Sequence, residues 1–379
     1  MIRLLIVEIL RLLYISGRSD YSGGPIMMKR LVQRLDKSSF KVWIALPKED
    51  QGIDQELAQD FEIIDIQSRS FSLSDLFTLI RCVKRNKIEV IHSHGKAAGF
   101  LSRVLGVVCG VPVVHHLHGI HYQQYSILFR FIYLKVESLL SALSSKVICV
   151  SESEQNDGVD MGVFLKEKSL VIPNGIDISH FRPQHIRTLR DDLKLSQDAF
   201  ILASISRYCY QKNIDASLEI IAKLKDSGCN AYLLLIGVSP VDAQLQKRMA
   251  ELKITNQVIC PPQVNDTRDL LNQADIYLST SRWEGMSLGL LEAMACGLPS
   301  VISNVVGNMD LLPFQNEGTF CVDQHSIPAY LEVIKKLALD TKYRQEMGQA
   351  ARQQVTDHYN LAHSIQSIEN LYLSLGLRD

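Results

Sequence analysis

One apolar stretch in the second half of the sequence limits what the chain can fold into. Residues 288–296 are apolar on nearly every side except at Glu292, which is the pattern of a helix buried all round. Gly297 can end such a helix and Pro299 prevents its continuation. Residues 298–302 then have the composition of a buried strand. The stretch therefore predicts a buried helix that leads directly into a buried strand.

Two carboxylates frame the start of this predicted helix. Glu292 lies inside it, where a carboxylate is costly unless another group hydrogen-bonds to it, and Glu284 precedes it. A rise of about 1.5 Å per residue places the two carboxylates roughly 12 Å apart, which is about the reach from a sugar across a diphosphate to a ribose. Gly285, Ser287 and Gly289 lie between them at the helix N-terminus, which favours an anion. The pattern fits a nucleotide-sugar site, and the alternative is a buried helix with one salt-bridged glutamate.

These residues resemble a family motif. Glu284, seven residues and Glu292 are similar to the E-x7-E motif of retaining glycosyltransferases with the GT-B fold, and the surrounding sequence resembles glycosyltransferase family 4. The resemblance implies an α/β fold of GT-B type, with two Rossmann-like domains facing a central cleft and a C-terminal helix crossing back to the first domain. It implies an acceptor-side domain at residues 1–185, a nucleotide-sugar-binding domain at 195–360 and the returning helix at 361–379.

Length and composition agree with this class. A chain of 379 residues has room for two domains with substantial cores. The net charge of −1 gives no indication of a nucleic-acid-binding protein. The eight cysteines form no C-x-x-C pair, so we predict buried thiols in a reducing compartment and neither a zinc site nor disulfides. The N-terminal 15 residues carry Arg3, Glu8 and Arg11, and they are too short and too charged to span a membrane.

Two glycines follow the first predicted strand, at residues 12–16. Gly23 and Gly24 lie at the N-terminus of the next predicted helix, whose first position fits Pro25. An ordinary turn between strand and helix is the alternative. The position resembles the Gly-Gly loop of family 4, which implies that both glycines face the donor diphosphate and the acceptor.

Histidines follow two further predicted strands. The set between residues 92 and 121 consists of His92, His94, His115, His116, His118 and His121. No spacing among them matches a tetrahedral site and no carboxylate joins them, so we predict no metal. Ligands of parallel sheets bind beyond the carboxyl ends of the strands, where His94 and Lys96 lie. His118, followed by a glycine, resembles the family's histidine near the catalytic centre, whereas we expect structural roles for His92 and His115.

The segment at residues 122–143 is predicted to be helical and strongly apolar. It could contact a membrane surface. Because its basic residues are few, Arg130 and Lys135, we expect it to pack in the core instead. Tyr122 joins His94 and Lys96 as an acceptor-side candidate.

Two cations follow the strand predicted at residues 201–207. Arg207 supplies a planar fork and Lys212 a point charge, and both suit a diphosphate. Their spacing resembles the Arg-x4-Lys of family 4, although Ser206 and Asn213 stand where the family has glycines. Basic loop residues that are simply solvated are the alternative.

The resemblance implies a complete donor site and two catalytic residues, His118 and Glu284. Glu284 would hold the sugar hydroxyls, Glu292 the ribose hydroxyls, and His118 would assist near the reacting carbon. Residues 306–308 would complete the pocket, while Pro262 replaces a family glycine near the base, so the base stays open. The implied donor contacts are Gly23, Gly24, Arg207, Lys212, Glu284, Gly285, Met286, Ser287, Leu288 and Glu292.

The implied function is transfer of a sugar with retention from a nucleotide-diphosphate sugar, with UDP favoured. The acceptor would be a saccharide or a polyprenyl-linked saccharide in the synthesis of O-antigen, capsule or exopolysaccharide, in the cytoplasm or at the inner face of the plasma membrane. The sequence contains no Asp-x-Asp, so we expect no metal and no cofactor. A non-catalytic subunit that binds glycans or nucleotide sugars, and a nucleotide-sugar epimerase, are the alternatives. The first would be expected to lose Arg207, Lys212 or a glutamate of the pair, and the second to lack the pair.

Overall fold

The computed structural model describes six ranges: residues 9–48, 52–68, 72–184, 186, 188–262 and 264–376. Arg3 and Glu8, which entered the prediction about the N-terminus, lie outside them. The chain folds into two compact units. One contains the chain up to Pro173 together with the residues from His363 onward, and the other contains residues 174–362.

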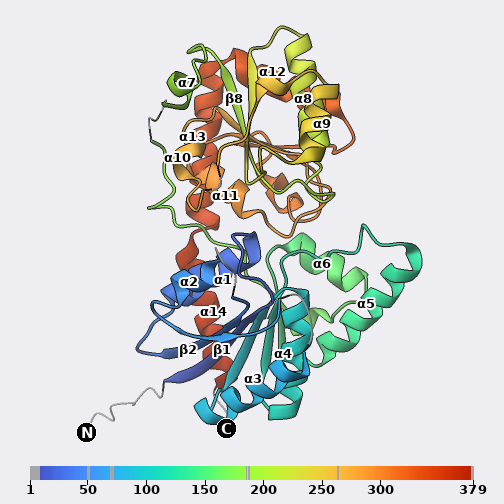
Figure 1. The fold of residues 1–379 in the computed structure, drawn as a ribbon, viewed down its shortest axis with the longest axis vertical. Coiled ribbons are helices and arrows are strands. Elements are labelled where there is room, and N and C mark those ends of the chain that lie inside the picture. The colour runs from blue at the N-terminus through green and yellow to red at the C-terminus, as the bar shows by residue number, and fades with distance from the viewer. Residues whose placement is uncertain are drawn as a thin grey trace. The chain divides into compact units, whose positions relative to one another are not determined.

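The first unit is built on a seven-stranded parallel sheet with the order β3-β2-β1-β4-β5-β6-β7 (Figure 1). Because β1 lies beside β4, the direction in which the sheet grows reverses between them, as in Rossmann folds. The strands are β1 (Leu10–Ser16), β2 (Phe40–Leu46), β3 (Glu62–Asp65), β4 (Val90–His94), β5 (Val113–His116), β6 (Lys146–Cys149) and β7 (Ser169–Val171).

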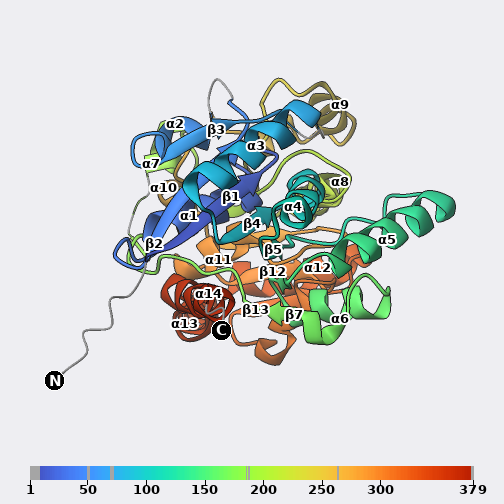
Figure 2. The same cartoon turned by 90° about the horizontal axis from the view of Figure 1, so that it is seen from below.

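Helices cover both faces of this sheet. Leu13 and Ile15 of β1 pack in one core with residues of α3 and α4, whereas Tyr14 points to the other face and contacts Tyr372 of α14. Figure 2 shows α14 across the sheet from α3 and α4. The helices are α1 (Gly23–Arg34), α2 (Ile53–Leu57), α3 (Leu73–Asn86), α4 (Lys96–Cys109), α5 (Ile127–Ala142), α6 (Glu152–Asp160), a 3-10 turn at Lys166–Lys168 and α14 (Leu361–Gly376).

The second unit repeats this plan with a six-stranded parallel sheet of order β10-β9-β8-β11-β12-β13. Its strands are β8 (Phe200–Ile205), β9 (Ala231–Ile236), β10 (Val258–Ile259), β11 (Ile276–Ser279), β12 (Ser300–Ser303) and β13 (Thr319–Val322). Its helices are α7 (Thr188–Asp192), α8 (Ile214–Asp226), α9 (Ala243–Glu251), α10 (Arg268–Leu271), α11 (Leu288–Ala295), α12 (Ile327–Leu339) and α13 (Thr341–His358), with 3-10 turns at Thr255–Gln257 and Met309–Phe314. Here β8 and β11 are the neighbours at which sheet growth reverses.

The predicted architecture of two Rossmann-like sheets with a returning C-terminal helix is confirmed. The buried helix is α11, all of whose residues are buried. It ends where Gly297 takes a φ of +80°, a value that favours glycine. The estimate of 12 Å assumed a helical rise over the whole interval from Glu284 to Glu292. That assumption was wrong, because the helix begins only at Leu288 and the first part of the interval is not helical.

The prediction that residues 122–143 pack in the core was wrong. The helix α5 begins only at Ile127, and its apolar side chains are largely exposed, with Ile127 91% and Leu139 73% accessible. Figure 1 shows α5 at the edge of this unit, and much of its apolar surface is in contact with solvent. Within the described ranges, no helix is both long and apolar enough to span a membrane.

Candidate active site

The loops after β8 and β11 form the first part of the site, in the second unit. Because these two strands are parallel neighbours, their carboxyl ends meet at one edge of the sheet. Arg207, which is exposed, and Lys212 follow β8, while residues 280–287 follow β11. The predicted cations and the first predicted glutamate are therefore carried by adjacent loops.

Glu284 is buried at this edge with a cation beside it. Lys212 Nζ lies 2.6 Å from Glu284 Oε1, and Ser281 Oγ donates to the same oxygen over 2.6 Å. The main-chain N–H of Glu284 donates to Val306 O over 3.0 Å, which fixes the loop. A charge-assisted bond of this kind stabilises a buried carboxylate. A sugar hydroxyl or a diphosphate that enters here meets both a carboxylate and an ammonium group.

Glu292 lies on α11 and is also buried. Its Oε2 accepts a hydrogen bond from Thr267 Oγ1 over 2.7 Å, just before α10 begins. The partner that a buried carboxylate requires is thus supplied in part by a neutral hydroxyl. Sequence reasoning missed Thr267, because nothing in its local pattern links it to α11.

The loop between the two glutamates is held by a side chain distant in sequence. Asn174 Nδ2 donates to Met286 O over 2.9 Å, and the Ser287 side chain accepts from Leu290 N at the start of α11. Asn174 is 3% exposed, and within the described ranges its Oδ1 has no hydrogen-bond partner. Its place in a Pro-Asn-Gly sequence was the available signal.

Gly307 packs against the same loop from the end of β12. Its φ is +86°, and a Cβ added there would lie 2.7 Å from Glu284 O and closer still to Gly285 O. Any larger residue would push the Glu284 loop away. Residues 306–308 were predicted to complete the pocket, and this close approach gives a physical reason for the glycine.

The first unit places three predicted residues together beyond β1, β4 and β5. A Cβ added at Gly24 would lie 3.2 Å from His118 Cδ2, and His94 Nδ1 lies 2.9 Å from His118 Nε2. An added Cβ at Gly23 would meet no atom of the described chain within 4 Å. Gly24, His94 and His118 therefore form one surface.

His118 is neutral at physiological pH. Burial, with a smaller contribution from the nearby His121, lowers its pKa from 6.5 to about 3. Burial also lowers the pKa of His94 well below its usual value. This pair therefore provides hydrogen bonds, and it provides no cation to a departing phosphate.

The other acceptor-side candidates are already engaged. Lys96 Nζ donates to His121 O over 2.9 Å, and burial lowers its pKa. Tyr122 OH donates to Asp157 Oδ1 over 2.7 Å. Lys96 therefore contacts the segment at residues 121–125, which follows His118 closely in the chain. The Tyr122 hydroxyl is directed to α6.

Three of the histidines lie closer together than their spacing in the sequence indicated. His92, His94 and His116 are all buried, and one ring nitrogen from each lies within 4.8 Å of the others. Residues 92, 94 and 116 meet because β4 and β5 are parallel and in register, which linear spacing does not reveal. Metal binding itself stays untested by this geometry.

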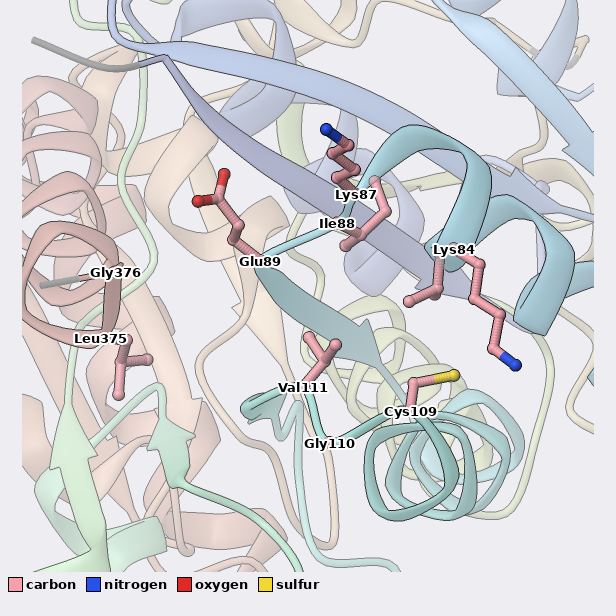
Figure 3. Close-up of a pocket in the computed structure, with 10 residues that line it drawn as sticks. Lys84, Lys87, Ile88, Glu89, Cys109, Gly110, Val111, Leu375 and Gly376 are labelled. Atoms are coloured by element: carbon pink, nitrogen blue, oxygen red, sulfur yellow. The ribbon is translucent and has the colours of Figure 1, made fainter. Parts of the chain in front are cut away.

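A cavity of about 310 Å³ lies elsewhere in the first unit (Figure 3). It opens where β4 and β5 begin, between Lys87, Glu89, Gly110 and Leu375. None of the predicted site residues lines it. It therefore lies away from the carboxyl ends of the strands, where ligands of such sheets bind.

Solved structures define the class. The Anabaena protein HepE in complex with UDP-glucose is similar over 96% of this chain and 100% of that chain, with a TM-score of 0.84 and 19% identity. A glycosyltransferase from Rickettsia africae is similar over 98% and 100%, with a TM-score of 0.82 and 18% identity. These likenesses show that the chain has the GT-B fold.

Family models cover most of the chain. Residues 21–180 match Glycosyltransferase Family 4, and residues 185–354 match Glycosyl transferases group 1. The chain belongs to glycosyltransferase family 4, as its E-x7-E stretch predicted.

Curated relatives agree with the family. One is the UDP-Gal:alpha-D-GlcNAc-diphosphoundecaprenol alpha-1,3-galactosyltransferase of Escherichia coli, 24% identical over 80% of this chain and 80% of that protein. Another is the capsular polysaccharide biosynthesis glycosyltransferase CapM of Staphylococcus aureus, 21% identical over 91% of this chain and 93% of that protein.

Proposed function

We propose that this glycosyltransferase moves a sugar from a nucleotide-diphosphate sugar, with UDP favoured, to a saccharide or lipid-linked saccharide in surface polysaccharide synthesis. The observation that carries the proposal is the Lys212–Glu284 pair, held at the reversal point of the second sheet beside α11. The UDP-sugar donor and the undecaprenol-linked acceptor named for the E. coli relative support the two substrate classes.

Donor binding follows from the charges of the second unit. We assign the sugar hydroxyls to Glu284 and the ribose hydroxyls to Glu292, by resemblance and because both carboxylates are buried acceptors. Arg207, Lys212 and the N-terminus of α11 would stabilise the diphosphate as its negative charge develops, without a metal. The loop of Gly285, Met286, Ser287 and Leu288, with Gly23 and Gly24, completes the proposed donor set.

The reaction is proposed to retain the anomeric configuration. A double displacement would require a carboxylate nucleophile, and neither His94 nor His118 at the first unit's site is one. We therefore propose a displacement on one face of the sugar, in which the departing phosphate oxygen accepts the acceptor's proton. His118, being neutral, would position a hydroxyl near the reacting carbon through a hydrogen bond.

We assign acceptor binding to residues 1–185, donor binding to 195–360 and the returning helix to 361–379. The acceptor-side candidates stay His94, Lys96 and Tyr122. Because the Tyr122 hydroxyl is bonded to Asp157, it supports the shape of this surface more directly than it would bind a sugar.

We also propose that α5 lies on an anionic lipid surface at the inner face of the plasma membrane. Its exposed apolar residues are Ile127, Leu128, Phe129, Phe131, Ile132, Val136 and Leu139. Its carboxylate, Glu137, is buried and paired with Arg103 at 3.1 Å, while Lys135 is exposed. An apolar face with a basic residue and no exposed carboxylate suits anionic lipid headgroups.

Vesicle flotation tests the membrane proposal. The wild-type protein should float with vesicles that contain phosphatidylglycerol, and Leu128→Glu with Leu139→Glu should not. The exposed Leu339→Glu on α12 is the matched control and should float as wild type does. Equal flotation of all three proteins would overturn the α5 assignment.

Thermal melting with UDP-, GDP- and ADP-sugars tests the donor site. A ligand at about a hundred times its dissociation constant adds roughly 2.7 kcal/mol to the free energy of unfolding. We expect a shift with one nucleotide family that is lost in Glu292→Ala and kept in Glu346→Ala, an exposed residue on α13. No shift with any donor would overturn the donor assignment.

The main alternative is a non-catalytic binding subunit. It would bind the donor and give the same thermal shift, but it would form no product. The sequence retains Arg207, Lys212, Glu284 and Glu292, which favours turnover. Release of the nucleotide diphosphate with an undecaprenyl-diphosphate-linked sugar as acceptor separates the two functions.

A further inference from the structure

Buried aromatic and imidazole rings share one face of the first sheet. Tyr14 of β1 pairs in register with His92 of β4, and His94 pairs with His116 of β5, so their side chains alternate onto the same side. Tyr372 of α14 covers this side, and its hydroxyl bonds both the Tyr14 hydroxyl and His92 Nδ1. The histidines are therefore sealed between the sheet and the C-terminal helix.

Four ring nitrogens in this group have no hydrogen-bond partner among the residues that the structure describes. They are His92 Nε2, His94 Nε2 and both nitrogens of His116, and all four atoms are buried. Buried polar atoms are otherwise almost always bonded, so unpaired ones call for an ion or water that satisfies them. A single bound ion explains the unpaired nitrogens of all three side chains more simply than a separate cause for each.

The three histidines offer ring nitrogens that lie close to one another. One nitrogen from each ring lies within 4.8 Å of the others, and the ring centroids are 4.6, 4.9 and 5.5 Å apart. Zinc–nitrogen bonds of about 2.0–2.1 Å in a tetrahedral arrangement require ligand nitrogens about 3.3 Å apart. The ring planes lie at only 18°, 31° and 14° to one another, so each ring has to turn about its broad terminal torsion before the three nitrogens face one ion.

We propose that His92, His94 and His116 bind one divalent ion of the zinc type, with a fourth position open to a small ligand. Neutral imidazole suits Zn²⁺, Cu²⁺ and Ni²⁺, and sets of three histidines are known to hold zinc. The ion is separate from the diphosphate contacts proposed for Arg207 and Lys212, which belong to the second unit.

A divalent ion bound here would place its charge inside the protein. No described carboxylate belongs to the set, so a hydroxide or another anion at the fourth position would reduce the buried charge.

Metal binding would also position His118. If His94 binds the ion through Nε2, its proton must reside on Nδ1, which can then donate to His118 Nε2, the nitrogen that lies 2.9 Å from it in the structure. The proton of His118 is thereby fixed on its Nδ1. The orientation of the His118 ring then depends on the metal. This part of the inference rests on the proposed function of His118, whereas metal binding does not.

Cobalt titration tests the site. Protein treated with EDTA and then dialysed should bind one Co²⁺ per chain and develop the visible absorption band of tetrahedral cobalt, which Zn²⁺ should abolish by displacement. His116→Leu should lose the band, and it should fold, because the wild-type ring makes no hydrogen bond in the described structure. His115→Gln is the matched control, since it lies on the other face of β5, bonded to Ser93 at 3.0 Å, and should keep the band.

Two results would overturn the proposal. One is no cobalt or zinc binding by the wild-type protein, which would mean that ordered water satisfies the ring nitrogens. The other is equal binding by wild type and His116→Leu, which would place the ion elsewhere. Either result leaves donor-induced melting shifts unchanged, so failure here is distinguishable from failure of the proposed function.

Discussion

Mild acid should unfold the first unit selectively when no metal is present. Five of its histidines, four of them fully buried and His118 partly so, have pKa values below the usual range because burial disfavours their charged form. The unfolded chain binds their protons near pH 6.5, so below that pH it holds more protons than the folded unit. Stability is therefore complete above about pH 6.5 and is lost as the pH falls toward the folded pKa values. The five are His92, His94, His115, His116 and His118.

The size of the effect follows from the proton balance. At pH 5.5 each such histidine lowers the free energy of unfolding by about 1.4 kcal/mol relative to pH 7.5. Five of them amount to about 7 kcal/mol, which is comparable with the whole stability of a domain. For a unit of this size that loss corresponds to a fall of about 14 to 28 °C in melting temperature.

Differential scanning calorimetry of EDTA-treated protein at pH 7.5 and 5.5 measures the effect. Removing one ring with His116→Leu should restore about 1.4 kcal/mol at pH 5.5. It should be near neutral at pH 7.5, because no hydrogen bond of the described structure is lost. His180→Gln is the control, because His180 is exposed and belongs to the second unit. A first-unit transition that moves by only a few degrees between the two pH values would refute the reasoning, since the rings would then be charging in place.

Two further predictions concern the second unit. Gly307→Ala should cost about 1 to 2 kcal/mol from its positive φ alone and should also weaken donor binding, because the added Cβ displaces the Gly285 carbonyl. Chemical unfolding and donor titration check this, and donor affinity equal to wild type would contradict it. Lys212→Met should cost about 3 kcal/mol by leaving the Glu284 carboxylate buried without its cation. Adding Glu284→Gln should recover much of that stability but not transfer activity, and an additive double variant would argue against the pair.

Much of the second unit's site could be predicted from local sequence. The helix at 288–296 is nearly all apolar, so its burial needs no knowledge of the fold, and Gly297 marks its end. Both Glu284 and Glu292 stand out against that background. Their partners do not, because Thr267 and Asn174 reach them only after the chain has folded.

The prediction for α5 was wrong because apolar composition does not say where a helix lies. Counting Arg130 and Lys135 as too few for a membrane surface left the core as the remaining choice. A helix packed in the core needs neighbours on its apolar face, and composition alone does not show whether it has them. Ile127 and Leu139 are exposed, despite a sequence typical of a buried helix.

The histidine cluster is a second feature that local sequence did not predict. Judged by spacing, no set of them suited a metal, since separations of 2 and 22 residues fit no familiar metal motif. Because β4 and β5 pair in parallel, His116 lies beside His94 in the sheet although the two are far apart in the sequence. Alternation along β4 then adds His92 on the same face. A cluster of this kind depends on which strands become neighbours, so it can be found in a sequence only after the sheet order has been derived.

The two units share one type of topology but differ in the charge of the side chains at their candidate sites. In the second unit the candidate residues follow the two strands at the reversal point, whereas in the first unit they lie at the carboxyl ends of β1, β4 and β5. The second unit places a charged pair there, Lys212 and Glu284, which can respond to a charged donor. The first unit places neutral rings there, because burial removes the charge of His94 and His118. Arg207 and Lys212 of the second unit are therefore the cations that we expect to stabilise a departing diphosphate, whereas we expect His94 and His118 to contribute hydrogen bonds.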